Sequence, residues 1–398
     1  LWMTLAKYLF IFLSLNYLFS TQVLSADCAD ASGTTVTIST SCTALSISGD
    51  VTNLTINSGI TIDKAGKGAV SIGNNTVTTL TNNGTIKTTS SHYGLRHTGS
   101  GLITTLINNG SITSAERYGL STGSSATITT IENSGTISAG AHSGLRNYLG
   151  TIGTITNSGT ISATNRYGLY NSGTITTLTN TNTGTISAGT NYAIANTGSI
   201  GTFTNTGTLT PTGNTGISNQ GSITTFNNSQ GRSGSNPVTF TKSLPTNYNV
   251  IVNSDSDYGQ IEFSSFSGQT NTILDFGVHT TLSNLEANTT YSSVLSGLSS
   301  SNITITLDKG HNSPSSLIGL TRYYWTLVER AGSLWDLKIA DAVNITTDTN
   351  TSVTSSVKPN VILGINNLTS VTEVNFANMN TYDCDLFDKN NICLSLGS

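Results

Sequence analysis

The 398-residue sequence is poor in charge: its 16 Lys and Arg and 20 Asp and Glu make up 9% of the residues and leave a net charge of -4. This composition excludes a broad basic surface, so no nucleic-acid partner is expected. With 40 Gly and 5 Pro, the chain is typical of β-structure with tight corners.

Residues 1–26 are predicted to be a secretory signal peptide. Lys7 precedes an apolar run from Tyr8 to about Phe19, and small residues lead to a cleavage site at Ala26. The run is too short and too early for a membrane-spanning helix. We therefore expect export across the inner membrane, to the cell surface, the outer membrane or the extracellular medium.

The four cysteines form two local pairs, one near each end of the mature chain. Cys28 and Cys42 fall in residues 27–50, a predicted N-terminal cap, and Cys384 and Cys393 fall in residues 341–398. In an exported protein, such short loops are typical of disulfides that tie down exposed edge strands. A metal site is the alternative, but neither pair has further Cys or His nearby, so we predict no metal.

A unit of about 25 residues recurs through residues 51–236. The glycine of an N-x-G-[TS]-I segment marks it, at Gly59, Gly84, Gly110, Gly135, Gly159, Gly184 and Gly207. Further glycines follow the Tyr of a YGL segment, which gives each unit sharp corners between three short strands. A chain with this repeat forms a solenoid, in which each turn packs against its neighbours. The predicted fold is all-β, a right-handed parallel β-helix of about seven coils.

Aliphatic side chains recur at fixed positions of the unit, flanked by Thr, Ser and Asn, as in strands with one solvated face. A disordered polar tract, the alternative, does not demand this. Two predicted core columns are Leu80, Leu106, Ile131, Ile155, Leu178, Phe203 and Phe226, and Ile86, Ile112, Ile137, Ile161, Ile186 and Leu209. The other two are Leu95, Leu120, Leu145, Leu169, Ile194 and Ile217, and, at a fourth corner, Ile103, Ile128, Ile152, Ile175, Ile200 and Ile223.

Asn and Gly are expected at the corners for two reasons. Both residues tolerate positive φ, which sharp turns often require. Stacked Asn amides can also hydrogen-bond to one another along the rod.

Residues 237–340 are strand-rich but less repetitive. Their most informative part is YYWTLVERAGSLWDLKI, in which two apolar-polar alternating segments flank a turn at residues 331–333. This pattern predicts a hairpin with aromatic residues near its turn.

The export signal, the Thr/Asn/Gly-rich β-helix and this terminal hairpin together resemble the passenger of a Gram-negative autotransporter, the type V secretion family. In that family an outer-membrane barrel carries the passenger to the cell surface, and the last rungs act as an autochaperone. The resemblance implies an autochaperone-like segment at residues 237–340. Its packing residues would be Trp325, Leu327, Leu334, Trp335 and Leu337.

The sequence departs from the family at its C-terminal end. A barrel needs many amphipathic strands, and only about sixty residues follow Ile339. We expect residues 341–398 to be a linker toward an outer-membrane translocator barrel in cis, missing from a truncated sequence. A barrel on another chain, or release of the protein, are the alternatives.

Catalytic residues are not expected. A carbohydrate-active β-helix, such as a polysaccharide lyase or a tailspike-like hydrolase, needs clustered carboxylates and a Lys or Arg on neighbouring coils. The repeat has only scattered acids, among them Glu116 and Glu132. Asp383, Asp385 and Asp388 resemble part of a Ca²⁺ loop but lack its Gly and closing Glu. We predict no enzymatic activity and no cofactor, with the carbohydrate-active β-helix as the alternative.

One stripe of the repeat departs from the Thr/Asn pattern. Its members precede or follow the YGL-type glycine, and they are His92, Tyr93, Arg96, Arg117, Tyr118, His142, Arg146, Arg166, Tyr167 and Tyr192. Stacked coils would align them into a ribbon of aromatic faces and cations, which suits sugars and their carboxylate or sulfate groups. The alternative is a Tyr ladder that stabilises a corner, with solvated Arg heads.

The sequence therefore predicts a surface-displayed adhesin or structural rod. Its partners would be host-cell or environmental glycans, or surface proteins. A purely structural surface rod would need no discrete ligand.

Overall fold

The computed structural model describes residues 27–66, 68–211, 215–232, 236–265, 273–300, 303–308 and 314–344. The chain divides into two units, Leu1–Ala342 and Val343–Ser398, and the first contains almost all of the described residues. The predicted signal peptide, the Cys384 and Cys393 pair, the Asp383 cluster and residues 345–398 of the expected linker lie outside these ranges. No helix long and apolar enough to cross a membrane is found among the described residues.

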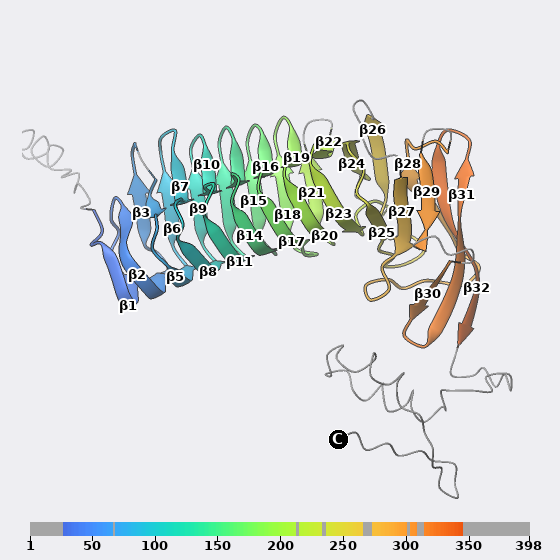
Figure 1. Ribbon diagram of the computed structural model, residues 1–398, viewed down its shortest axis with the longest axis horizontal. Helices are drawn as coiled ribbons and strands as arrows, with labels where there is room; N and C mark the ends of the chain where they lie inside the picture. Colours follow the sequence, from blue (N-terminus) through green and yellow to red (C-terminus); the bar gives the residue numbers. More distant parts are fainter. Residues whose placement is uncertain are drawn as a thin grey trace, which may run out of the picture. The chain divides into compact units, whose positions relative to one another are not determined.

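The repeat forms a parallel β-solenoid with three faces, which we call sheets A, B and C (Figure 1). Sheet A contains β1 (Ala31–Ile38), β2 (Leu45–Ile56), β5 (Val77–Asn82), β8 (Leu102–Asn108), β11 (Thr127–Asn133), β14 (Thr151–Asn157), β17 (Thr174–Asn180), β20 (Ser199–Asn205) and β23 (Ser222–Asn228). Sheet B contains β3 (Thr61–Lys64), β6 (Thr85–Thr88), β9 (Ser111–Ser114), β12 (Thr136–Ala139), β15 (Thr160–Ala163), β18 (Thr185–Ala188) and β21 (Thr208–Pro211). Sheet C contains the first residues of β2, then β4 (Val70–Ile72), β7 (Tyr93–His97), β10 (Tyr118–Thr122), β13 (Ser143–Asn147), β16 (Tyr167–Asn171), β19 (Tyr192–Asn196) and β22 (Thr215–Asn219).

The predicted parallel β-helix is confirmed. The seven strands of sheet B match the seven predicted coils, and the solenoid has about nine turns in all, at a spacing of roughly 25 residues. All four predicted core columns are buried, with exposed fractions of 0% to 3%. The column expected at a fourth corner instead shares sheet A with the first column, since Ile103 and Leu106 both lie on β8.

Two internal ladders of asparagine run along the corners of the solenoid. In each ladder the side-chain Nδ2 donates to the Oδ1 of the next coil, at 2.7 to 3.0 Å. One follows the ends of the sheet A strands and the other the ends of the sheet C strands; they are Asn82, Asn108, Asn133, Asn157, Asn180, Asn205 and Asn228, and Asn147, Asn171, Asn196 and Asn219. Every one of these amides is fully buried. Their Nδ2 groups also donate to corner carbonyls such as those of Gly135 and Gly159, so these buried amides are satisfied by the protein itself.

The expectation that corner glycines adopt positive φ is wrong for most coils. Among the glycines that mark the repeat, Gly59 has φ 77°, but Gly84, Gly110 and Gly135 have no positive φ. A methyl group added to Gly110 or Gly135 would instead collide with the carbonyl oxygen of the preceding coil. Glycine is needed there because stacked backbones approach closely, not because the turn is left-handed.

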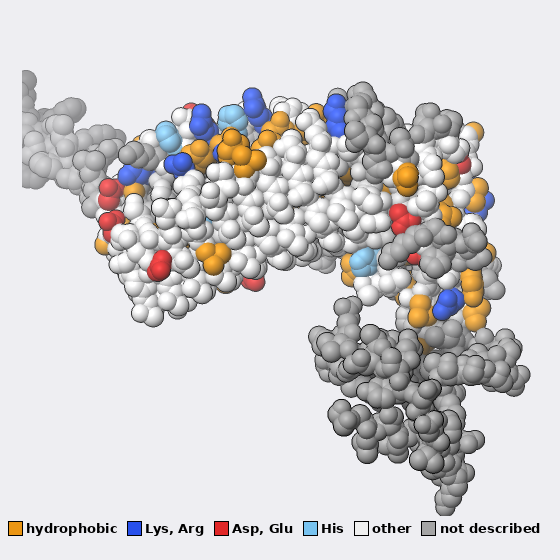
Figure 2. All heavy atoms as spheres, in the orientation of Figure 1, with side chains coloured by type: hydrophobic (Ala, Val, Ile, Leu, Met, Phe, Trp, Pro, Cys, Tyr) orange, Lys and Arg blue, Asp and Glu red, His pale blue; other side chains and the backbone are white. Residues whose placement is uncertain are grey.

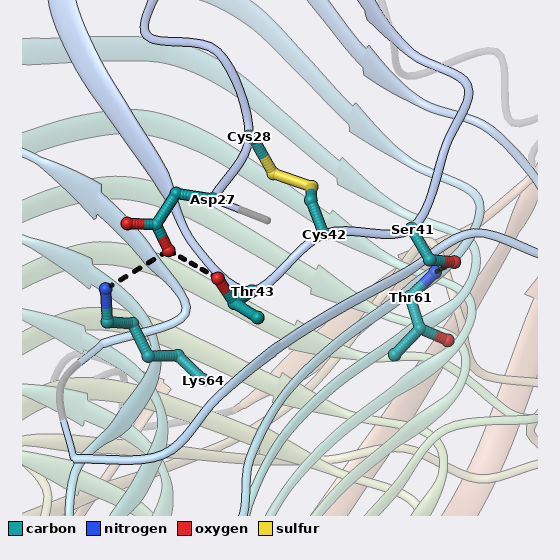
Figure 3. The surroundings of a disulfide bond; sticks show 7 residues. All are labelled: Asp27, Cys28, Ser41, Cys42, Thr43, Thr61 and Lys64. Atoms are coloured by element: carbon teal, nitrogen blue, oxygen red, sulfur yellow. Dashed lines mark hydrogen bonds and ion pairs between the residues drawn. A yellow bond between two sulfur atoms is a disulfide. The ribbon is translucent and has the colours of Figure 1, made fainter. Parts of the chain in front are cut away.

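The N-terminal end of the solenoid is covered by a segment that a disulfide holds in place (Figure 3). Cys28 and Cys42 form this disulfide, and Cys42 makes an isolated parallel bridge to β3. Asp27 accepts a hydrogen bond from Thr43 and lies 3.6 Å from the Nζ of Lys64. Two effects lower the pKa of Asp27: the hydrogen bond from Thr43 is the larger, and the charge of Lys64 is the next. The first strand of sheet B therefore has a neighbour on its outer edge.

The other end of sheet B is closed by a side chain. The Oε1 of Gln230 accepts from the Leu209 backbone N–H at 2.7 Å, and its Nε2 donates to the Leu209 carbonyl at 3.1 Å. The side-chain amide of Gln230 thus makes the two hydrogen bonds to β21 that a further strand of sheet B would make. Pro211, in the same strand, has no N–H to offer, as is usual on an edge strand.

Beyond the repeat, sheets A and C continue while sheet B, among the described strands, ends at β21. Sheet A gains β25 (Asn247–Val250), β27 (Ile273–Val278) and β29 (Thr304–Leu307), and sheet C gains β24 (Val238–Lys242), β26 (Ile261–Ser265) and β28 (Thr290–Ser296). The last strands are β30 (Ser315–Ile318), β31 (Thr321–Arg330) and β32 (Leu334–Asn344). β30 pairs with β31, and β32 pairs with β28, both antiparallel.

The core of this C-terminal region is aromatic. Phe203, Phe226, Tyr248, Phe276 and Trp325 contact one another in sequence, with ring centroids 4.9 to 5.9 Å apart. The predicted turn at residues 331–333 joins β31 to β32. Of the five packing residues that the resemblance implied, Trp325, Trp335 and Leu337 are buried, Leu327 packs against the core, and Leu334 is half-buried.

Candidate ligand-binding face of sheet C

One outer surface of the solenoid concentrates arginine and tyrosine. All four Arg and all six Tyr between residues 51 and 231 lie on it. We call it the sheet C face and define it as His92, Tyr93, Arg96, Arg117, Tyr118, His142, Arg146, Tyr148, Arg166, Tyr167, Tyr170 and Tyr192. Figure 2 shows Lys or Arg and His side chains following one another along one long edge of the solenoid, beside hydrophobic side chains.

The YGL segment positions these side chains. In β7, Gly94 and Leu95 are buried, Tyr93 is half-buried and Arg96 is exposed. The neighbouring coils repeat this arrangement, and a methyl group added to Gly119 would lie 2.7 Å from the Ser138 carbonyl oxygen of sheet B. The glycine thus lets sheet C approach sheet B. The Tyr and Arg side chains that flank the Gly-Leu pair reach the outer surface, whereas the smaller Ser121 and Ser143 at the same positions are buried.

The coils stack these residues in register. Tyr118 lies opposite Tyr93 and Ser143, and Tyr167 lies opposite Ser143 and Tyr192. The Tyr93 and Tyr118 rings stack at 5.5 Å, and the Tyr167 and Tyr192 rings stack at 6.0 Å. Where the column holds Ser143, the ring of His142 lies 5.5 Å from that of Tyr118.

Two arginines lie on these tyrosine rings. The guanidinium carbon of Arg96 is 5.2 Å from the Tyr93 ring centroid. Arg146 lies between two rings, 4.7 Å from that of Tyr118 and 4.1 Å from that of Tyr148. Cation–π stacking engages the face of a guanidinium and leaves the N–H donors at its edge available.

The sheet C face is positively charged. Within the described ranges, no carboxylate forms an ion pair with any of its four arginines, and no hydrogen bond uses their guanidinium groups. Desolvation and then the charges of Arg166, Arg117 and Arg146 lower the pKa of His142. The exposed Glu116 is the acid beside Arg117 in sequence. This surface can therefore attract an anion with little internal competition.

Tyr148 and Tyr170 belong to this surface but not to the stripe predicted from the sequence. Tyr148 follows the ladder residue Asn147, at a corner that carries one extra residue, Leu149, with φ 56° and 54% exposure. Tyr170 occupies the position of Arg96 and Arg146 and stacks on Tyr167 at 5.6 Å. The register of the repeat could have indicated Tyr170, whereas Tyr148 lies in a column that holds Gly123 and Ser172 in the neighbouring coils and so carries no repeated signal.

A shallow hollow of about 240 Å³ lies elsewhere, on the outer side of sheet A. Its lining includes one carboxylate, Glu132, beside Asn109, Ser134 and Ser158. Acid/base hydrolysis of a glycoside uses two carboxylates. Among the described residues, no group of three His, Cys, Asp or Glu side chains is placed to hold a metal ion.

The sheet C face combines flat aromatic surfaces with unpaired guanidinium edges. The first can stack on the apolar face of a sugar ring, and the second can bind carboxylate or sulfate in bidentate geometry. Comparison with protein-family models, curated proteins and solved structures gives no match for this chain.

Proposed function

We propose that this protein is an exported, surface-displayed β-solenoid, a passenger of autotransporter type, that acts as an adhesin through its sheet C face. The observation that carries this proposal is the placement of every Arg and Tyr of residues 51–231 on one outer surface. The coils are otherwise uniform inside, so packing of the core does not require that distribution.

Other features support export and display. The disulfide between Cys28 and Cys42 suits an oxidising compartment. The solenoid holds its surface on a stiff scaffold, because each turn is bonded to the turns before and after it. Ligand residues set on strands keep their spacing better than ligand residues on loops.

The test is surface labelling and adhesion of Gram-negative cells that express the complete gene. Intact cells should be labelled by an antibody against residues 51–231, and the label should be lost after external protease. They should also bind host cells or glycan-coated surfaces more than cells without the gene. Substituting Arg96, Arg117, Arg146 and Arg166 by Gln should abolish that binding while labelling persists. Labelling that appears only after cells are permeabilised would refute surface display.

A structural rod without a ligand is the second candidate. The ring stacking of Tyr167 on Tyr192, at 6.0 Å, and of Arg146 between two rings favours it, because such contacts themselves stabilise a surface. Normal surface labelling together with unchanged adhesion in the four-arginine variant would support the rod and contradict the adhesin.

A further inference from the structure

The four arginines of the sheet C face form a zigzag along the solenoid. Arg96 and Arg146 occupy one column, with Ser121 of the intervening coil between them. Arg117 and Arg166 occupy a second column, with His142 between them, as the backbone bonds from Ser143 to Arg117 and from Tyr167 to His142 show. From the coil of Arg96 to that of Arg166, each of four successive coils thus presents one arginine, and the two columns alternate.

The zigzag has a fixed repeat. Arginines of the same column are two coils apart, which corresponds to about 9.6 Å for stacked strands. This is close to the length of one disaccharide in an extended glycan. Tyrosine rings lie between the cations: Arg146 contacts the Tyr118 ring at 4.7 Å, and Tyr118 stacks on Tyr93.

The charge density of this surface is low. It offers one Arg per coil over four successive coils, flanked by Thr, Ser and Asn, and the chain as a whole has a net charge of -4. A glycan with one carboxylate per two sugars matches the spacing of the arginines within one column.

We propose that the sheet C face binds a linear acidic polysaccharide with one carboxylate per disaccharide, lying along the solenoid axis. The carboxylates would pair with the guanidinium edges of one column, and the intervening sugars would stack on the tyrosine rings. This inference rests on the proposed function of the same face in adhesion and names the class of its ligand.

Hyaluronan oligosaccharides are the probe, because they carry one glucuronate per disaccharide and no sulfate. The purified chain should bind a hyaluronan decasaccharide and not neutral dextran of similar length. One of the double variants R96Q/R146Q and R117Q/R166Q should weaken binding at least about tenfold, because it removes the two charge-assisted contacts of the column that pairs with the carboxylates. Affinity should rise most steeply between the disaccharide and the tetrasaccharide, which is the shortest that spans two arginines of one column.

The matched control is R322Q/K338Q, which removes the same charge from β31 and β32, outside the sheet C face. It should bind within about twofold of the wild type, as expected for distant exposed charges. The proposal is overturned if this control weakens binding as much as the more damaging arginine pair does, or if a disaccharide binds as tightly as the decasaccharide. Equal binding of a single-stranded oligonucleotide of matched charge would also overturn it.

The two proposals fail separately. If hyaluronan does not bind but displayed protein still promotes adhesion that depends on the four arginines, the ligand class is wrong and the adhesin stands. If hyaluronan binds as predicted but the protein never reaches the cell surface, the ligand class stands and surface display is wrong.

Discussion

The repeat and the C-terminal region use the same two sheets but stabilise them differently. In the repeat before β20, the core is aliphatic and uniform, and buried Asn ladders bond each coil to the next. After Gln230 the described strands lack sheet B, and the core becomes a chain of aromatic rings closed by antiparallel strands. Because the coils pack against one another through the same inner residues, their outer residues can vary without loss of stability. Residues specific to function are therefore expected on the outer face of the repeat.

The largest effect is expected where the two regions meet. The Phe226 ring contacts Phe203 at 4.9 Å and Tyr248 at 5.9 Å. Phe226→Ala should lower the free energy of unfolding by about 4 kcal/mol, and Leu178→Ala, inside the repeat, by about 3 kcal/mol. Tryptophan fluorescence reports Trp325 and Trp335, and circular dichroism reports both regions. In Phe226→Ala, the unfolding midpoint measured by fluorescence should fall further than the midpoint measured by circular dichroism. Equal shifts in the two midpoints would show that both regions unfold as one cooperative unit.

Breaking an Asn ladder should rank next. Asn157 donates to Asn180 at 2.8 Å and accepts from Asn133 at 2.7 Å, and all three amides are fully buried. Asn157→Ala leaves both neighbours short of a partner and should cost about 3 kcal/mol in chemical denaturation. Asn109, an exposed amide bonded to Asn83, is the control, and Asn109→Ala should cost at most about 0.5 kcal/mol. Equal losses of unfolding free energy in the two variants would mean that burial of the ladder amides adds nothing to stability.

The reason that the corners require glycine can be tested with two alanine substitutions. At Gly135 a Cβ would collide with the Gly110 carbonyl oxygen, so Gly135→Ala should force the coils apart and cost about 2 kcal/mol. At Gly59 a Cβ meets open space but φ is 77°, so Gly59→Ala should cost about 1 kcal/mol. Thermal unfolding should rank them in this order. The reverse order would restore turn handedness as the reason for corner glycines.

The smallest expected effect is that of pH. His97 is buried where later coils carry ladder Asn, with Nδ1 3.4 Å from the Ile72 carbonyl and Nε2 3.0 Å from that of Gly101. Burial lowers its pKa from 6.5, although the carbonyls oppose this. The unfolded chain therefore binds the proton more readily, so stability is full above pH 6.5 and falls as pH drops below it.

His142 and His279 have lowered pKa values too, so they act in the same direction. The unfolding midpoint should therefore be lower at pH 5 than at pH 7, and His97→Asn should reduce this difference without removing it. A midpoint that rises at pH 5 would show that the carbonyls stabilise the charged imidazolium more than burial destabilises it.

Much of the fold follows from the sequence because the repeat is long and regular. Aliphatic residues at a fixed phase indicated every core column, and Asn before Gly indicated the ladders. The reason for the corner glycines could not be read, because close approach of backbones depends on neighbouring coils, not on local residues. Tyr148 escaped prediction because the neighbouring coils hold Gly123 and Ser172 at its position, and the role of Gln230 depends on where sheet B ends.

The central claim is that the arginines of the sheet C face serve a ligand and not the fold. Its most direct test is the thermal unfolding midpoint of R96Q/R117Q/R146Q/R166Q, with and without hyaluronan decasaccharide. Since these guanidinium groups form no ion pair among the described residues, the variant should unfold within about 4 °C of the wild type. Hyaluronan should raise the midpoint of the wild type alone. A variant that unfolds far earlier, or that hyaluronan stabilises equally, would contradict the claim.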